Sequence, residues 1–530
     1  MDAHSTYHKA CKEIAEELIK ASTEPGIELT RSDIEIIKKR IAKKYNLSRI
    51  PSNPDIRKFI PDNERIKKML RIKPVRTISG VAVVAVMSSP APCPHGRCVP
   101  CPGGIKTPQS YTGREPAAMR AIQHGYDPFR QVTARLGELK EIGHAVDKVE
   151  IIVMGGTFPA RDKEYRDHFI LNIYNALNSF DSDPSISSTI EEAKEINEKA
   201  KARCIGMTFE TRPDYCGLGE IKEMLSYGGT KVELGVQSIY DDVLEIIKRG
   251  HGVDATVKAT KLLKNSAFKV GYHIMPGLPS SDFERDLRMF RKIFEDERFK
   301  PDYLKIYPTL VVDGTELYEM YRSGEYRPYT TEEVAELIAR AKRFFPKWVR
   351  VQRIQRDIPV KLAIGLDKGN LRQIVHQKLK ERGWRCNCIR CREIGHNVGE
   401  SRVEEILSSC ELKIERYRAS DGVEYFISYE TEDFLAGFIR LRFCEAALEE
   451  IENHALIREL HVYGISLPLG LKDSSSPQHR GIGSKLLSAA EEIAIQEFDR
   501  IAVISGVGAR EYYRKHGYKK LRNYMAKRLK

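Results

Sequence analysis

The sequence has little that is typical of a membrane or secreted protein. The apolar run VAVVAVM at residues 81–87 is seven residues long, whereas a membrane-spanning helix needs about 20. The start, MDAHSTYHKACKEIAEELIK, lacks the apolar core of a signal peptide. We therefore expect a cytoplasmic protein with no membrane partner. In that compartment the 11 cysteines are free, metal-bound or catalytic rather than paired as disulfides.

Length and charge indicate several domains and a polyanionic partner. A chain of 530 residues is too long for one ordinary core, so two or three domains are expected. The formal net charge is +13, and residues 1–75 alone hold 17 Lys and Arg against 11 Asp and Glu. The run KKRIAKKY in this segment either contacts the partner or forms a solvated helix face. The candidate contacts are Lys38, Lys39, Arg40, Lys43 and Lys44.

After residue 75, apolar runs alternate with polar segments of helical length. The runs are TISGVAVVAVM, VEIIVMGG, CIGMTFE, KVELGVQ, FKVGYHIM and YLKIYPTL. Strands that alternate with helices form parallel βαβ units, and six in series predict an open or closed barrel. Polar, glycine and proline residues follow each run. Such folds place their active sites at this end of the strands.

Three cysteines follow the first of these runs, in the segment CPHGRCVPCPGG. Cys93, Cys98 and Cys101 on one loop suit a four-iron, four-sulfur cluster with one open iron, and zinc or a structural role is the alternative. The arrangement resembles that of radical S-adenosylmethionine (SAM) enzymes, although C-x4-C-x2-C is not their commoner spacing. The resemblance implies that SAM binds the open iron and yields a 5′-deoxyadenosyl radical. It also implies that the turn at Gly155 and Gly156 approaches the methionine group.

The C-terminal region carries a different pattern, in which the strand ELHVYGI precedes the glycine-rich turn QHRGIGS and an amphipathic helix. Bare amides at a helix N-terminus bind anions. The order resembles the GNAT acetyltransferases, which implies acetyl-CoA with its pantetheine arm along the strand and its phosphates on the turn. The implied strand contacts are Glu459, Leu460, His461 and Val462, and the implied turn contacts are Gln478, Gly481, Ile482, Gly483 and Ser484. Tyr512 and Tyr513 lie near the thioester by this resemblance, or are core aromatics.

Between these regions, the segment RCNCIRCREIGH has the spacing of a metal site. Cys386, Cys388 and Cys391 can converge on one ion, and His396 can complete a tetrahedron. Zinc in a structural role is the prediction, and three free thiols are the alternative. Cys410 or His376 can replace the histidine as fourth ligand.

The order of all these motifs over essentially the whole chain resembles the family of Elongator catalytic subunits. The resemblance implies a basic helical tRNA-binding region (1–75), a partial (β/α) radical SAM barrel (76–370), a zinc-binding connector (371–410) and a GNAT α/β domain (411–530). It implies that C5 of the wobble uridine in the tRNA anticodon loop receives a carboxymethyl group derived from acetyl-CoA. An electron donor is then required, and a homodimer is left open.

Lys148, in DKVEII, takes its role from this resemblance, because it matches a lysine that contacts acetyl-CoA; without the resemblance it would be an exposed lysine at a strand start. Lys305, at the end of a strand, and the segment YRSGEYRPY mix cations with aromatic residues, so we expect them to line the path of the anticodon loop. Two other classes of function remain: a protein lysine acetyltransferase with a structural barrel, and a noncatalytic tRNA-binding protein that senses acetyl-CoA.

Overall fold

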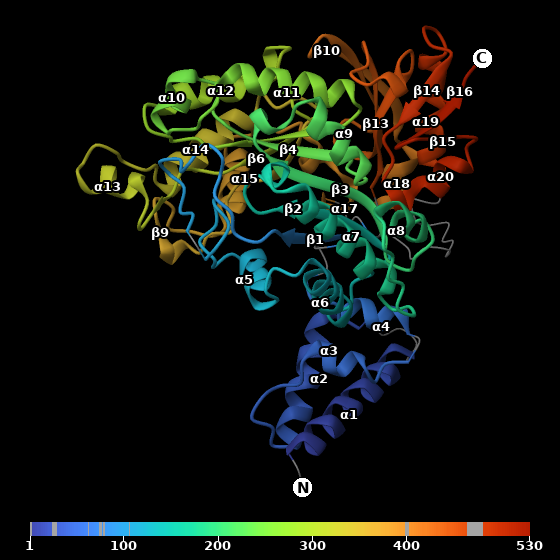
Figure 1. Ribbon diagram of the computed structural model, residues 1–530. Helices are drawn as coiled ribbons and strands as arrows, with labels where there is room; N and C mark the ends of the chain where they lie inside the picture. The colour runs from blue at the N-terminus through green and yellow to red at the C-terminus, as the bar shows by residue number, and fades with distance from the viewer. Residues whose placement is uncertain are drawn as a thin grey trace.

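The protein has three parts, which follow one another along the chain (Figure 1). The computed structural model describes residues 3–23, 29–61, 63–73, 77, 80–104, 106–397, 402–463 and 481–530. The N-terminal helices, blue in Figure 1, lie at one end, against the barrel helix α6. The strands of the C-terminal domain, orange to red, lie beside the barrel. Within the described residues, no helix is long and apolar enough to cross a membrane.

The N-terminal part is a small helical unit with its own hydrophobic core. Its helices are α1 (Ala3–Thr23), α2 (Arg31–Lys44), α3 (Asn53–Arg57) and α4 (Glu64–Met69). Thr30 caps α2 through a reciprocal pair of hydrogen bonds with Asp33, which satisfies amides that the first helical turn leaves unpaired. The buried side of α2 carries Ile34, Ile37 and Ile41, which recur at helical spacing and pack on α1.

The central part is an open parallel sheet wrapped by helices. Its strands pair in the order β1-β2-β3-β4-β5-β6-β8, all parallel. They span β1 (Ala82–Met87), β2 (Lys148–Met154), β3 (Arg203–Thr211), β4 (Lys231–Gln237), β5 (Lys269–Ile274), β6 (Tyr303–Ile306) and β8 (Arg350–Arg353). β1 and β8 are the two edges, so the barrel is partial, as predicted. Six strands match the predicted runs, and β8 is additional.

Helices follow the strands as the alternation predicts. They are α5 (Pro116–Gln123), α6 (Pro128–Glu141), α7 (Lys163–Ser179), α8 (Ile190–Asn197), α9 (Leu218–Ser226), α10 (Asp241–Ile246), α11 (Val253–Asn265), α12 (Phe283–Glu295), α13 (Glu316–Arg322), α14 (Thr331–Lys342) and α15 (Leu371–Glu381). Short 3₁₀ turns are η2 (Phe158–Ala160), η3 (Pro213–Tyr215) and η4 (Val360–Leu362), and β7 (Val311–Val312) pairs with β9 (Ala363–Ile364).

The connector and the C-terminal domain complete the chain with a second, mixed sheet. The connector helices are α16 (Ile389–Arg392), α17 (Ile394–Asn397) and α18 (Val403–Ser408). The sheet order is β10-β11-β12-β13-β14-β16-β15. Its elements are β10 (Glu411–Ala419), β11 (Gly422–Glu430), β12 (Leu435–Phe443), η6 (Glu449–Ile451), β13 (Ala455–Val462), α19 (Ile482–Ala494), β14 (Arg500–Val503), η8 (Val507–Ala509), α20 (Arg510–Arg514), β15 (Lys519–Leu521) and β16 (Tyr524–Arg528).

The two sheets are held together where η8 meets strand β3 of the barrel. Gly506 lies so close to β3 that a Cβ at this position would come within 2.0 Å of the Ile205 carbonyl oxygen. Only glycine allows this approach. The C-terminal domain therefore closes the end of the barrel at which the strands begin.

Candidate active site

A single cavity of about 1220 Å³ connects the cysteine loop of the barrel to the C-terminal domain. It follows the inner face of the parallel sheet, so alternate residues of several strands line it. These include Lys148, Glu150, Ile152 and Met154 of β2, Lys231, Glu233, Gly235 and Gln237 of β4, and Tyr303, Lys305 and Tyr307 on and after β6. Strand starts face the C-terminal domain, and strand ends face the cysteine loop.

The three cysteines line the strand-end side of this cavity. The Cys98 sulfur lies 3.0 Å from His95 Nε2 and 3.6 Å from Nη1 of Arg249, while Cys101 accepts a 3.3 Å hydrogen bond from the Ser110 amide. Burial raises the pKa of Cys93. The three sulfurs do not all lie within 4.8 Å of one another. In this they differ from two tighter groups of possible metal ligands among the described residues, which are Cys386, Cys388 and Cys391, and Glu210, Glu233 and His273. Because each thiolate of a cluster binds a different iron, this wider arrangement fits a cluster.

The glycine turn after β2 lies beside the cysteines. Gly155 has φ 116° and Gly156 has φ 83°, conformations that favour glycine. A Cβ at Gly155 would lie 2.6 Å from the Ser88 hydroxyl oxygen, and Gly156 lines the cavity. The turn thus presents bare backbone to the cavity next to Cys93, whose sulfur lies 3.9 Å from the Thr157 hydroxyl.

Charged side chains cover the middle of the cavity. Glu210 and Glu233 are direct neighbours on β3 and β4, and His273 and Lys305 are direct neighbours on β5 and β6. Lys305 Nζ lies 2.9 Å from Glu210 Oε1 and also contacts Glu233. Lys305, predicted to line the anticodon-loop path, is therefore buried inside the barrel. The two glutamates and His273 were not among the predicted site residues, although the charges at two alternate positions of KVELGVQ, Lys231 and Glu233, indicate an inward polar face.

Three lysines begin their strands at the opposite side of the cavity. Lys148, Lys231 and Lys269 all line it. Lys148 is half-buried, and burial lowers its pKa. Its position at the start of β2 places it on the side that the C-terminal domain covers.

The C-terminal domain contributes β13 and the tyrosines. β14 ends at Val503, opposite Ile457 of β13, so within the described residues no strand pairs with this side of β13 beyond Ile457. Glu459, Leu460 and His461 line the cavity in this unpaired segment, and Val462 ends the strand. A strand that has lost its neighbour on one side offers backbone groups to an extended ligand. The Glu459 carboxylate accepts a 2.9 Å hydrogen bond from Arg440 and one from Tyr303 of the barrel.

Tyr512 and Tyr513 of α20 both line the cavity. Tyr513 is 7% exposed, and burial raises the pKa of both hydroxyl groups. A Cβ at Gly483 would lie 2.8 Å from the Tyr512 hydroxyl, so α20 lies next to the start of α19.

The predicted glycine turn lies partly outside the described residues. Gln478 is outside them. Gly481 caps α19 with φ 73°, Ile482 and Gly483 begin the helix, and the Ser484 hydroxyl lies 2.9 Å from His516 Nε2.

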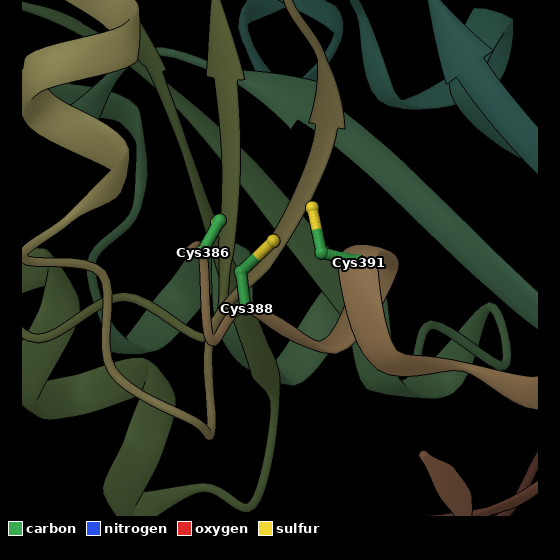
Figure 2. A group of neighbouring side chains, drawn as sticks. All are labelled: Cys386, Cys388 and Cys391. Atoms are coloured by element: carbon green, nitrogen blue, oxygen red, sulfur yellow. The ribbon is translucent and has the colours of Figure 1, made fainter. Parts of the chain in front are cut away.

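The connector cysteines form a second, separate group (Figure 2). The sulfurs of Cys386, Cys388 and Cys391 lie within 4.8 Å of one another. Hydrogen bonds from Cys386 and Cys388 lower the pKa of the Cys391 thiol. The positive charge of the Lys342 ammonium, which lies 3.5 Å from the Cys391 sulfur, lowers this pKa further. His396 lies in α17, but its side chain is outside the described residues.

The alternative fourth ligands do not complete this group. Neither Cys410 nor His376, both described, belongs to it. Neither residue therefore supplies the fourth ligand of a metal site at these cysteines.

The predicted basic contacts of α2 differ in exposure. Lys38 is 7% exposed and bonds to Glu35 and Asn53 at 2.7 and 2.8 Å. Arg40 pairs with Glu17 and Lys44 with Glu13. Lys39 and Lys43 are exposed, as are Arg40 and Lys44, so Lys38 is the one buried residue among the five predicted contacts. Lys38 falls on the buried stripe of α2, four residues after Ile34, a spacing visible in the sequence.

Comparisons with known families agree with this architecture. Residues 7–78 match the ELP3 N-terminal domain, 89–290 the radical SAM superfamily, 301–381 the radical SAM C-terminal domain and 396–518 the acetyltransferase (GNAT) family. A tRNA uridine(34) acetyltransferase of Methanocaldococcus jannaschii is 51% identical over 90% of this chain and 90% of its own length. Elongator complex protein 3 of Homo sapiens is 45% identical over 94% of this chain and 93% of its own length.

A solved structure covers most of the fold. The archaeal Methanocaldococcus infernus Elp3 with an N-terminal deletion aligns with a TM-score of 0.74 and 45% identity, over 85% of this chain and all of that one.

Proposed function

The chain belongs to the family of the tRNA uridine(34) acetyltransferases and Elongator complex protein 3, and we propose that it transfers the acetyl unit of acetyl-CoA to C5 of uridine 34 in tRNA. It is an acyltransferase with a radical SAM and a GNAT domain. The family implies a four-iron, four-sulfur cluster, SAM and acetyl-CoA.

The residues of the strand-end side fit the cluster and SAM. Cys93, Cys98 and Cys101 would hold the cluster, and the turn at Gly155 and Gly156 would approach the methionine group of SAM. When bound, this pair supplies a 5′-deoxyadenosyl radical able to remove a hydrogen atom from an unactivated carbon. An electron donor supplies the electron.

The residues of the strand-start side would hold acetyl-CoA. The pantetheine arm would lie along the open edge of β13 at Glu459–Val462, with the phosphates at the start of α19. Tyr513 would position the thioester and Lys148 would contact the donor, since both line the cavity. The acetyl methyl carbon, after losing one hydrogen atom, would bond to C5 of uridine and open the C5–C6 double bond. Return of one electron to the electron carrier and loss of the C5 proton would restore that double bond. Hydrolysis of the thioester would then leave 5-carboxymethyluridine.

The observation that carries this proposal is the single cavity between the cysteine loop and Tyr513. A protein lysine acetyltransferase would need no open path from the acetyl site to the cysteines. A noncatalytic sensor of acetyl-CoA would need neither the cysteine loop nor an open path to it.

Two further elements of the proposal concern tRNA and zinc. The exposed Lys39 and Lys43 would contact tRNA phosphates beyond the cavity. Zinc at Cys386, Cys388 and Cys391 would have a structural role, because these cysteines do not line the cavity.

Anaerobic reconstitution with iron and sulfide, followed by mass spectrometry of tRNA nucleosides, tests the proposal. We expect 5-carboxymethyluridine and 5′-deoxyadenosine to form only when SAM, acetyl-CoA, reductant and tRNA are all present. Acetylated lysine formed without SAM would support the lysine acetyltransferase instead. Tight binding of acetyl-CoA and tRNA with no product of either kind would support the sensor.

A further inference from the structure

The charged group in the middle of the cavity has the composition of a base-reading site. This group, here named the floor cluster, consists of Glu210, Glu233, His273 and Lys305. It comes from four adjacent strands, which makes its geometry rigid. It lies between the cysteines and the C-terminal domain, where the proposed function needs the uridine.

A metal ion does not fit the floor cluster, although three of its residues have suitable ligand atoms. The Lys305 ammonium already occupies the space between the two carboxylates, with Nζ 2.9 Å from Glu210 Oε1 and in contact with Glu233. Two glutamates side by side on neighbouring strands repel each other unless a cation separates them. Lys305 is that cation.

Hydrogen-bonding capacity remains on two members of the floor cluster. Glu233 is 1% exposed and contacts Lys305, His273 and Lys231. Glu210 is 13% exposed, and among the described residues its Oε2 accepts a hydrogen bond from the Tyr111 hydroxyl alone, at 3.1 Å, which leaves a second lone pair of this oxygen for a ligand. Lys305 has three N–H groups and uses two for the carboxylates.

Aromatic and guanidinium groups flank the floor cluster on the cysteine side. The Tyr307 ring meets His273 edge-on at 5.3 Å. The Arg356 guanidinium lies 6.0 Å from the Tyr111 ring centre and 5.9 Å from that of Tyr307. Unpaired RNA bases are recognised by stacking on such groups and by hydrogen bonds to their Watson–Crick edges.

We propose that the floor cluster selects uracil, with Lys305 donating to carbonyl oxygen O4 and Glu210 accepting from N3–H. This inference rests on the proposed function and names the residues that set its base specificity. Cytosine presents an amino group and an unprotonated N3 at the same two positions. Its amino group would face the ammonium and its N3 lone pair would face the carboxylate, so the floor cluster rejects it.

Binding of short RNAs to the reconstituted holoenzyme tests this selection. The probes are synthetic anticodon stem-loops that differ only at position 34, which carries uridine, cytidine or 3-methyluridine. We expect the wild-type protein to bind the uridine loop roughly tenfold or more tightly than the other two, since each lost hydrogen bond to a charged group is costly. The 3-methyl probe blocks N3–H without any change in the protein. Equal binding of all three loops overturns the proposal.

The matched protein variant is Glu210→Gln, which keeps the size of the side chain. In this variant the Lys305 ammonium should bond to the amide oxygen at the position of Oε1. The amide NH₂ group would then take the place of Oε2, the oxygen that accepts N3–H in the wild type. The preference for uridine over cytidine should disappear, while the iron absorbance and the affinity for SAM stay unchanged. Glu191→Gln, at an exposed glutamate paired with Lys194, should keep the full preference.

Two results with these variants overturn the proposal. One is a retained uridine preference in Glu210→Gln, and the other is a loss of SAM affinity as large as the loss of stem-loop affinity, which would assign the floor cluster to SAM. The readout is binding, so it is separate from the product assay. If the wild type forms no carboxymethyluridine but still prefers the uridine loop, the proposed chemistry fails and the base-reading site stands.

Discussion

Arg458 of β13 donates one hydrogen bond to each carboxylate oxygen of Asp302, both at 2.7 Å, across the boundary between the C-terminal domain and the barrel. Both side chains are fully buried. Asp302, just before β6, also accepts from the Val270 amide of β5, and Arg458 also bonds to Glu424 of β11. One buried ion pair therefore ties two strands of each sheet together and fixes the wall of the cavity.

Replacement of Arg458 by Met should destabilise the protein strongly. It leaves Asp302 and Glu424 buried with fewer partners, which costs about 3–5 kcal/mol in comparable cases. Urea denaturation followed by circular dichroism measures the change in unfolding free energy. The control is Arg418→Met, because Arg418 and Glu297 form an exposed pair, for which about 0–1 kcal/mol is expected. Equal effects of the two substitutions would contradict a stabilising role for the buried pair.

The same pair predicts a pH dependence of stability. Burial alone would raise the pKa of Asp302, but Arg458 and then Lys264 outweigh it and hold this pKa well below its usual range. In the unfolded chain an aspartate has a pKa of about 3.9. The stabilisation by this carboxylate is therefore complete above that pH and is lost as the pH falls towards the lower folded pKa.

Denaturation of the wild type and of Asp302→Asn at several pH values checks this dependence. The unfolding free energy of the wild type should fall more steeply below about pH 4 than that of the variant. Parallel curves would assign the acid sensitivity to other carboxylates.

Replacement of Cys98 by Ala should abolish the cluster without unfolding the barrel. Cys98 is half-buried at the cavity mouth and its sulfur packs against His95, so the lost volume is small. After anaerobic reconstitution we expect no cluster absorbance and no 5′-deoxyadenosine, with an unchanged circular dichroism spectrum. Cys444→Ala, a half-buried cysteine that does not line the cavity, should keep both signals. A Cys98→Ala variant that contains no iron but still forms carboxymethyluridine would exclude the radical chemistry.

Removal of the exposed charges of α2 should weaken tRNA binding. Each phosphate contact that is lost lowers the slope of log affinity against log salt by about 0.7–0.9. Lys39→Ala with Lys43→Ala should therefore reduce tRNA affinity and flatten the slope by roughly 1.5, as measured by filter binding at several salt concentrations. Lys38→Ala should instead lower the stability of the N-terminal helices, because it removes the bonds to Glu35 and Asn53. An unchanged slope in the double variant would make α2 a solvated face.

The sequence predicted the strands better than the polar interior. Six apolar runs became β1–β6 because a buried strand needs an uninterrupted apolar face. β8 is four residues long and reads RVQR, so its local pattern is too short and too polar to identify it. Three members of the floor cluster, Glu210, Glu233 and His273, were missed for a related reason, whereas Lys305 was predicted as a site residue. Glu233 and Lys305 are inward-facing only in the context of the curved sheet, which brings compensating charges from other strands beside them.

The final prediction concerns the acetyl donor. Tyr513 and Lys148 line the same cavity from opposite domains, so both can reach a thioester placed between them. The Tyr513 hydroxyl is protonated at neutral pH and can donate a hydrogen bond, and burial raises its pKa further. Tyr513→Phe removes this donor and retains the ring that packs edge-on against Tyr518 at 5.7 Å.

Product formation and any tRNA-stimulated hydrolysis of acetyl-CoA should therefore fall at least roughly tenfold in Tyr513→Phe, while iron absorbance and folding remain. Lys148→Ala should reduce the same two activities. Tyr518→Phe is the matched control: its hydroxyl bonds to Glu491 outside the cavity, so stability should fall slightly and turnover should not. Normal acetyl-CoA turnover and normal carboxymethyluridine yield in both Tyr513→Phe and Lys148→Ala would show that the donor binds elsewhere, even if the radical chemistry at Cys98 is retained.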